Sequence, residues 1–240
     1  MSGAVTKGAA IYEGKAKTIY ATSRPDLLIQ YFKDDATAFN GKKKGTIQNK
    51  GICNNAISSH IFGLLEKEGV KTHFVSKLSH REMLVKKVEI IPIEVVMRNV
   101  VAGSLSTRMG IPEGEQIKEP VMELYYKSDP LGDPMINRYH IRAFNLATDE
   151  EVRFIEKESF RINKWLLSFF DKIGIRLVDY KLEYGRSPEG VLLADEISPD
   201  GCRLWDKATG EKMDKDRFRR DLGMLTEVYE EMTRRTLAAT

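Results

Sequence analysis

The sequence has few cysteines, few histidines and no long apolar run. Its 240 residues include 2 cysteines and 4 histidines. Cys53 and Cys202 stand far apart and outside any CxxC pattern, which excludes a disulfide scaffold and a thiolate zinc site and predicts a reducing compartment. The histidines show no HxxxH spacing, so we expect packing or surface roles for them. No apolar run approaches the length of a membrane span. We therefore expect a soluble cytoplasmic protein without a membrane partner.

The chain also lacks a concentration of charge of one sign. The net charge is +3, from 38 basic and 35 acidic residues that are interspersed through most of the chain. Nucleic-acid binding typically shows a basic stripe with interleaved aromatic residues, whereas the one dense basic run, residues 42–44, is expected to be a solvated loop. A nucleic-acid partner is therefore not expected.

Hydrophobic patterns predict both strands and helices. Strand-like segments cover residues 10–21, 27–32, 72–78, 82–90, 120–127, 175–185 and 190–198. Helical patterns cover residues 49–68, 103–110, 149–173 and 214–238, and polar loops are expected at 33–48 and 128–140. The core face of helix 149–173 is predicted to hold Val152, Ile155, Phe160, Ile162, Leu166, Phe169 and Phe170.

The order of these segments indicates a mixed α+β fold. It is neither a strict alternation of strand and helix nor an all-helical pattern. Pro92 punctuates the apolar extended run "EIIPIEVVMRNVV", which is expected to link two lobes. We predict a strand-rich N-terminal lobe over residues 1–90 and a larger α+β lobe over residues 91–240.

The segment "LVDYKLEYG" carries an unusual set of charges for a strand. Side chains alternate along a strand, so Asp179, Lys181 and Glu183 share one face, opposite the apolar residues. The next strand brings Asp195 to the same patch, and Glu196 is expected on the opposite face. A solvent-facing strand with a cross-strand ion pair is one interpretation. The other is a magnesium site, because Mg²⁺ uses one or two carboxylates together with substrate phosphates.

Two further segments place arginine near this hairpin. The turn in "SPDGCRLWD" delivers Arg203 to the same end of the sheet, and arginine is the usual bidentate partner of phosphate or carboxylate. In "MRNVVAGSL", Arg98 precedes Ser104 at the expected start of a helix, where either an anion site or a plain helix cap is possible. These segments predict an anionic second substrate.

The loop "GKAK" at residues 14–17 lies between two strand-like segments. It is no Walker A motif, because GxxxxGK[ST] is absent and no helix follows. A basic surface hairpin is one interpretation, and a hairpin turn that covers nucleotide phosphates is the other. Together with the acidic patch and the arginines it indicates an enzyme that binds Mg-ATP. A small-molecule kinase and a non-catalytic nucleotide-binding module remain alternatives; the kinase is disfavoured because no HRD-type catalytic loop is present.

Six motifs resemble, in order, the signatures of the SAICAR synthetase family. They are "GKAKTIY", "PIEVVMRNVVAGSL", "DPMIN", "VDYKLEYG", "ADEISPDGCRLWD" and "KMDKDRFR", spread over residues 11–225. The resemblance implies a ligase of purine biosynthesis that joins L-aspartate to carboxyaminoimidazole ribonucleotide (CAIR), with ATP giving ADP and phosphate. It also implies a two-lobed fold related to ATP-grasp enzymes, with antiparallel sheets and ATP between the lobes, and a homodimer.

The resemblance also carries roles over to single residues of this chain. It implies that ATP contacts Gly14, Lys15, Ala16, Lys17, Ile90, Lys127, Glu183 and Asp195, and that Asp195 holds Mg²⁺ on the phosphates. CAIR, mainly through its 5′-phosphate, is expected to contact Arg98, Ser104, Asp200 and Arg203. Asp179 and Lys181 are expected beside the CAIR carboxylate and the reacting centre. Arg138 departs from the family pattern after "DPMIN", and no role is assigned to Cys202.

The chemistry of a carboxylate agrees with this charge pattern. A carboxylate is a poor acyl donor, and its phosphorylation creates a leaving group for attack by the amine of aspartate. Such a step needs positive charge around the transferred phosphoryl group, which Mg²⁺ and lysines supply. An acyl-phosphate path is therefore our hypothesis, and no nucleophilic serine, cysteine or histidine is required.

Overall fold

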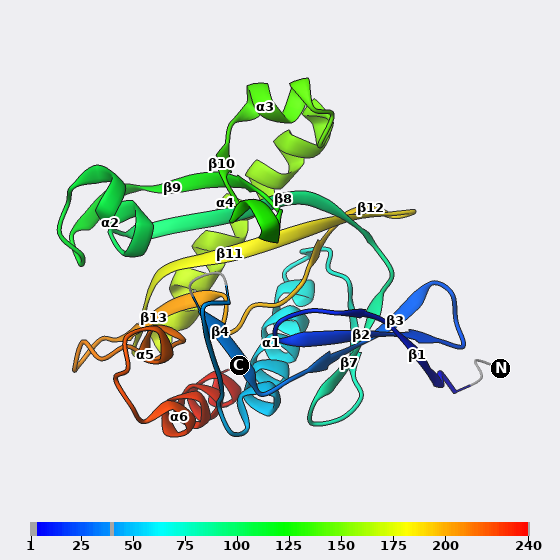
Figure 1. The fold of residues 1–240 in the computed structure, drawn as a ribbon, viewed down its shortest axis with the longest axis horizontal. Coiled ribbons are helices and arrows are strands. Elements are labelled where there is room, and N and C mark those ends of the chain that lie inside the picture. Colours follow the sequence, from blue (N-terminus) through cyan, green and yellow to red (C-terminus); the bar gives the residue numbers. More distant parts are fainter. Residues whose placement is uncertain (1–3, 39–40, 240) are drawn as a thin grey trace.

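Three antiparallel sheets organise the molecule (Figure 1), as seen in a computed structural model that describes residues 4–38 and 41–239. The first sheet has five strands in the order β1-β2-β3-β7-β6. Their bounds are β1 Lys7–Glu13, β2 Lys17–Thr22, β3 Leu27–Phe32, β7 Glu82–Lys86 and β6 Phe74–Lys77. The backbone N–H of Gly14 donates to the carbonyl of Lys17 over 2.8 Å and closes the turn between β1 and β2. The expected hairpin at "GKAK" is confirmed.

The second sheet has the order β10-β9-β8-β11-β12, and β13 pairs with β11 beyond the end of β12. Its strands are β10 Met135–Ile136, β9 Gln116–Tyr126, β8 Glu89–Val100, β11 Ile175–Ser187, β12 Gly190–Ala194 and β13 Cys202–Asp206. The long central strand β11 therefore has β8 along one edge and first β13, then β12, along the other. The segment between β12 and β13 runs beside the middle of β11.

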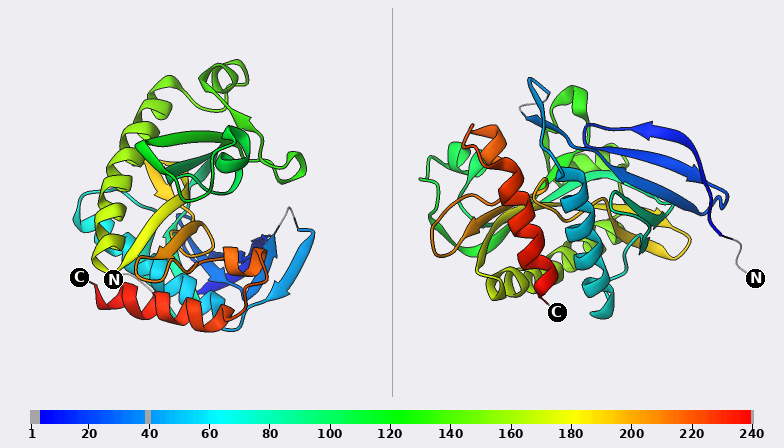
Figure 2. Two further views of the ribbon diagram at one scale, coloured as in Figure 1. Left: turned by 90° about the vertical axis from the view of Figure 1, so that its left-hand side faces the viewer. Right: turned by 90° about the horizontal axis from the view of Figure 1, so that it is seen from below.

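Helices cover the sheets on their apolar faces. Helix α1 (Lys50–Lys67) packs against the first sheet and against α6 (Leu225–Ala238), and α4 (Asp149–Lys172) covers one face of the second sheet. In the left view of Figure 2, α4 runs along the left side of the second sheet, and the blue strands of the first sheet lie lower in the picture. The shorter helices are α2 Gly103–Met109, η1 Asp129–Leu131, α3 Arg138–Ala143 and α5 Asp216–Arg219. None of the helices in the described ranges is long and apolar enough to cross a membrane.

The sequence explains why α4 forms where it does. Thr148 and Glu151 make a reciprocal capping box at its start, which satisfies backbone donors that a helix N-terminus leaves open. Its apolar stripe packs on β11, where Tyr180, Leu182 and Tyr184 are almost fully buried. The alternate residues of β11 stay on the opposite face, so the predicted division into an apolar and a charged face is confirmed from Asp179 to Tyr184. Val178, expected on the face of the tyrosines, instead packs with Val100, Ala102 and Trp205, next to a register shift between Leu177 and Asp179.

Four expectations about single segments are wrong. Within the expected loop 33–48, a hairpin forms from β4 (Asp35–Ala38) and β5 (Lys43–Thr46). The expected loop 128–140 contains η1, β10 and the first turn of α3. Phe160 is 40% exposed rather than buried.

The fourth wrong expectation is the single helix at residues 214–238. It is divided into α5 and α6, because Asp221, Gly223 and Met224 adopt left-handed backbone conformations that an α-helix cannot contain. The expected boundary between residues 90 and 91 lies within β8, and α6 from the end of the chain packs on α1. The division into two lobes at that residue stays a prediction.

Candidate active site

Strand register places three of the predicted residues side by side. Asp179 of β11 lies opposite Arg98 of β8 on one side and opposite Arg203 of β13 on the other. Directly opposed residues of an antiparallel pair have neighbouring side chains. The sheet therefore aligns a basic, an acidic and a basic side chain across three adjacent strands, although they are far apart in the sequence.

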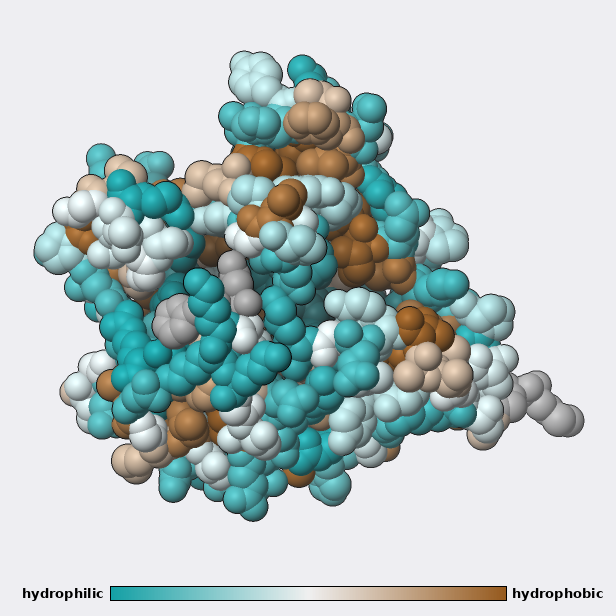
Figure 3. All heavy atoms as spheres, viewed as in Figure 1, coloured by the Kyte–Doolittle hydropathy of each residue, from teal (hydrophilic) through white to brown (hydrophobic). Residues whose placement is uncertain are grey.

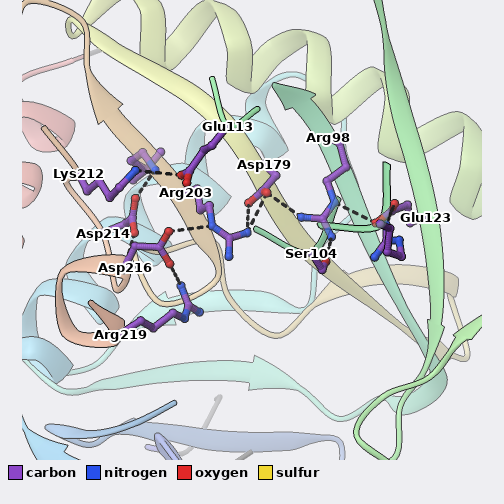
Figure 4. Close-up of polar contacts among 12 residues, drawn as sticks. Arg98, Ser104, Glu113, Glu123, Asp179, Arg203, Lys212, Asp214, Asp216 and Arg219 are labelled. Carbon is purple, nitrogen blue, oxygen red and sulfur yellow. Dashed lines mark hydrogen bonds and ion pairs between the residues drawn. The ribbon is translucent and has the colours of Figure 1, made fainter. Parts of the chain in front are cut away.

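These residues form a continuous arginine–carboxylate chain (Figure 4). Arg98 donates to Asp179 over 2.7 Å and to the Ser104 hydroxyl over 3.0 Å, and its Nε donates to Glu123 over 2.9 Å. Arg203 donates through Nη1 to both oxygens of Asp179 over 3.1 and 2.9 Å. We use "arginine–carboxylate chain" below for Arg98, Ser104, Glu123, Asp179, Arg203, Asp216 and Arg219.

The arginine–carboxylate chain continues from Arg203 into α5. Nε of Arg203 donates to Asp216 over 2.9 Å, and Arg219 donates to the other oxygen of Asp216 over 2.5 Å. Burial opposes the charge on Arg203, but Asp179 and Asp216 outweigh it and raise the pKa of its guanidinium. The same balance, with Asp179 and Glu123, raises the pKa of Arg98. Both arginines are therefore permanently charged.

Gly103 and Asp214 lie against the arginine–carboxylate chain. Gly103 has a positive φ of 53°, which favours glycine, and a Cβ atom there would come within 2.6 Å of the Arg203 guanidinium and displace it. The fully buried carboxylate of Asp214 accepts the backbone N–H groups of Leu204 and Asp216 over 2.7 and 2.6 Å. Burial and the nearby carboxylate of Asp216 raise the pKa of Asp214 to about 7.

A second group, the lysine–carboxylate cluster, lies farther along the same face of β11. It consists of Lys17, Glu94, Lys127, Lys181, Glu183, Asp195 and Glu196. Lys181 contacts Glu183 over 2.6 Å, Glu94 over 2.9 Å and Asp195 over 3.9 Å. Lys127 contacts Glu183 over 2.9 Å. Because strand residues advance about 3.3 Å each, Asp179 and Glu183 lie roughly 13 Å apart on one strand face.

Lys17 brings the N-terminal hairpin into this cluster. Its ammonium donates to Asp195 and lies 3.0 Å from Glu196. Burial would lower the pKa of Lys17, but the two carboxylates raise it above its usual value. Burial would raise the pKa of Asp195, but Lys17 and Lys181 hold it below its usual range. Lys17 and Asp195 are therefore both ionised at neutral pH.

The predicted position of Glu196 on the opposite face is wrong. Asp195 has a φ of 62°, a left-handed conformation that is rare for a residue with a side chain and turns the strand at its end. Alternation stops there, and both Asp195 and Glu196 face Lys17. The Asp195 carbonyl accepts a hydrogen bond from Gln30 over 3.3 Å, which holds the turn from the N-terminal sheet.

The other residues predicted to contact a nucleotide lie in two places. Gly14, Lys15 and Ala16 form the turn before β2, and Lys15 contacts Asp129 over 2.8 Å at an exposed position. Ile90, near the start of β8, is 37% exposed and lies opposite Gly185 of β11.

Asp200 lies apart from the arginine–carboxylate chain. One of its oxygens accepts from Lys50 over 2.7 Å and the other from the Tyr229 hydroxyl over 2.7 Å. Lys215 lies 3.6 Å away. Burial opposes its ionisation, but Lys50 and Lys215 hold the pKa of Asp200 below its usual range.

Sequence reasoning missed several members of these groups. Glu94 and Arg98 stand four residues apart in one strand, so period-2 alternation could have placed Glu94 on the charged face. Glu123 and Asp216 carry no comparable signal, because each depends on pairing with a distant segment.

No group of three or more His, Cys, Asp or Glu side chains forms a closed metal site within residues 4–38 and 41–239. Glu183 and Asp195 nevertheless flank the same ammonium, that of Lys181. Two carboxylates suit Mg²⁺ when substrate phosphates complete its oxygen shell, so the donor set is compatible with a nucleotide-borne magnesium ion.

Arg138 and Cys202, to which the family resemblance gives no role, lie outside these groups, and so do two cavities. Arg138 pairs with Glu156 on α4, and Cys202 is buried, which raises the pKa of its thiol.

Cavities of about 230 and 490 Å³ border α4 and contain no predicted site residue apart from the unassigned Arg138. In the space-filling view, hydrophilic residues surround the hollowed surface where the lobes meet (Figure 3).

Comparisons with known proteins agree on one family. Residues 10–236 match the family described as SAICAR synthetase. A phosphoribosylaminoimidazole-succinocarboxamide synthase of Magnetococcus marinus is 59% identical over 232 residues, which are 95% of this chain and 96% of that protein.

Solved structures give the same result. The synthase from Ehrlichia chaffeensis superposes with a TM-score of 0.94 at 50% identity and covers 96% of this chain and 99% of its own. A SAICAR synthetase (Type-2) in complex with ADP has a TM-score of 0.91 at 48% identity, over 94% of this chain and 96% of its own. These similarities extend over both lobes.

Proposed function

The chain belongs to the SAICAR synthetase family, ligases of purine biosynthesis, and we propose that it joins L-aspartate to CAIR at the expense of ATP. One observation carries this proposal: a single face of β11 bears a lysine–carboxylate cluster at one position and an arginine–carboxylate chain roughly 13 Å away. Two polyanionic substrates can thus be held end to end. A related protein that binds ADP supports the nucleotide half of the proposal.

The lysine–carboxylate cluster is the proposed site of Mg-ATP. Glu183 and Asp195 would hold Mg²⁺ together with the phosphates, and the bound ion would neutralise charge on the transferred phosphoryl group. Lys17 comes from the hairpin that covers this cluster, and Lys15 lies on the same turn. We propose Gly14, Lys15, Ala16 and Lys17 as the phosphate-covering turn, with Ile90 beside the base and Lys127 beside the phosphates.

The arginine–carboxylate chain is the proposed site of CAIR. Arg98 and Arg203 flank Asp179 and are permanently charged, and Ser104 offers a hydroxyl beside them. Guanidinium groups bind phosphate oxygens with charge-assisted hydrogen bonds. The 5′-phosphate of CAIR would take this end. Its carboxylate would then lie toward Lys181, between the two groups.

The proposed reaction has two steps. An oxygen of the CAIR carboxylate attacks the γ-phosphorus of ATP, and the bond to the ADP oxygen breaks, which gives an acyl phosphate and ADP. The aspartate ammonium loses one proton, the resulting amine attacks the acyl carbon, the carbon–oxygen bond to phosphate breaks, and the nitrogen loses its second proton. One proton leaves with inorganic phosphate and the other goes to solvent. Lys181, on the same face of β11, would stabilise negative charge on the reacting carboxylate.

An assay of ADP release tests the proposal. ATP is supplied with CAIR alone, with aspartate alone and with both, and ADP and SAICAR are quantified. We expect sustained release of ADP, with one SAICAR for each ADP, only with both substrates. Sustained ADP release without aspartate would instead indicate a small-molecule kinase and would contradict a ligase. We also propose that the protein is a cytoplasmic homodimer. This part of the proposal is supported only by membership of the family.

A further inference from the structure

The segment of residues 195–201 connects the two charged groups. It leaves β12 at Asp195, in the lysine–carboxylate cluster, and enters β13 just before Arg203, in the arginine–carboxylate chain. It runs along the edge of β11, where the N–H of Lys181 donates to the carbonyl of Gly201 over 3.0 Å. The segment therefore joins Asp195 of the one group to Arg203 of the other through a short stretch of backbone.

Buried side chains of α1 and α6 hold the segment. Lys50 of α1 is fully buried and contacts one oxygen of Asp200 over 2.7 Å. Tyr229 of α6 is also fully buried and donates its hydroxyl to the other oxygen over 2.7 Å. Two turns along α1 from Lys50, the Ser58 hydroxyl accepts the backbone N–H of Ile197 over 3.2 Å.

The surroundings of Asp200 argue against a direct contact with substrate. Its side chain is only 6% exposed, and each oxygen already has a buried donor. A carboxylate buried between an ammonium and a hydroxyl fixes the backbone that carries it, because breaking such a pair leaves an uncompensated buried charge. Asp200 is three residues before Arg203, so this fixation extends to the arginine.

We propose that Lys50, Asp200 and Tyr229 form a positioning node that places Arg203 relative to the nucleotide site. The kinetic part of this proposal rests on the proposed function, since it concerns binding of CAIR. In this proposal Asp200 has a positioning role in place of the CAIR contact that the family resemblance implies, and all three residues act through the segment 195–201. The Asp195 end of the segment has separate anchors in Lys17 and Gln30, so loosening the node affects the CAIR end more than the ATP end.

Tyr229→Phe is the most selective test, because it removes one hydroxyl and leaves the buried ring. We expect the KM for CAIR to rise about tenfold while the KM for ATP changes less than twofold, since small displacements of a positioning group have large kinetic effects. Amide hydrogen exchange of residues 197–204 should become faster. Lys50→Met, which keeps the chain length without the ammonium, should act in the same direction and more strongly.

Tyr184→Phe is the matched control. Tyr184 is equally buried, and its hydroxyl contacts Ser159 over 2.9 Å on the α4 side of the sheet. We expect it to leave the KM for CAIR and the exchange of residues 197–204 unchanged. An unchanged KM for CAIR in Tyr229→Phe, or an equal rise in Tyr184→Phe, would overturn the node.

The two proposals can fail separately. If the wild-type protein releases no ADP in response to CAIR and aspartate, the proposed function fails, and the node is judged by hydrogen exchange alone. Exchange of residues 197–204 that is unchanged in Tyr229→Phe would then overturn the node as well.

Discussion

Replacement of Arg203 by alanine separates substrate binding from folding. Arg203 makes charge-assisted contacts with Asp179 over 3.1 and 2.9 Å and with Asp216 over 2.9 Å. After Arg203→Ala, Asp179 keeps Arg98 at 2.7 Å, and Asp216 keeps Arg219 at 2.5 Å. Neither carboxylate loses its last cationic partner, so the fold should survive.

The two expected effects differ in size and can be measured independently. Loss of hydrogen bonds to charged groups should lower the free energy of unfolding by about 1.5–3 kcal/mol. Complete isolation of a buried charge would cost about 3–5 kcal/mol. If Arg203 binds the 5′-phosphate of CAIR, loss of that charge-assisted contact weakens CAIR binding by roughly ten- to hundredfold. ATP binding should change little.

Steady-state kinetics with each substrate varied in turn provide the test, with thermal unfolding measured on the same samples. Arg186→Ala is the control, because Arg186 also lies on β11 and contacts Glu151 over 2.6 Å and Glu89 over 2.9 Å, outside both charged groups. It should lose stability without a change in the KM for CAIR. An unaltered KM for CAIR in Arg203→Ala would remove Arg203 from the phosphate site and refute the reasoning.

Three further perturbations test other parts of the site. Asp195→Asn should abolish turnover by weakening Mg-ATP binding, while calorimetric titration of CAIR stays within about threefold of wild type; a comparable loss of CAIR affinity would show that this acid belongs to the other substrate. Asp214, with a pKa raised to about 7 by burial, keeps a proton that the unfolded chain releases near pH 4. The free energy of unfolding should therefore fall from pH 4 to pH 7 by up to about 4 kcal/mol relative to Asp214→Asn, and parallel pH profiles in chemical denaturation would contradict this. Gly103→Ala brings a Cβ against Arg203 and should raise the KM for CAIR, whereas Gly110→Ala, with a similar φ of 64° and open space around its Cβ, should only lower the melting temperature. Equal kinetics in the two glycine variants would exclude the close contact as the cause.

Much of the secondary structure followed from local patterns. Helices α1 and α4 and the hairpin of β11 and β12 lie within a few residues of the expected ranges. The apolar period is strong in α4, which buries one face, whereas α1 is buried around most of its circumference. Other segments were misjudged. The β4–β5 hairpin contains short polar strands. The break between α5 and α6 depends on left-handed conformations at Asp221, Gly223 and Met224, and the helix-stop signal of Gly223 was not used in the prediction.

The sequence by itself determined which residues share one face of strand β11. Alternation along β11 was enough to separate Asp179, Lys181 and Glu183 from the buried tyrosines, since the side-chain period of a strand is a local property. The motif order then indicated the family. Both inferences needed only neighbours in the chain.

Only the tertiary structure decided which distant groups satisfy those charges. Register across β8, β11 and β13 placed Arg98 and Arg203 on either side of Asp179, and the left-handed turn at Asp195 brought Glu196 to Lys17. The buried partners of Asp200 come from two helices about 150 and 29 residues away, as the contacts of Lys50 and Tyr229 show. A buried charge is stable only with a partner, and that partner is chosen by packing in three dimensions, which a one-dimensional pattern does not contain.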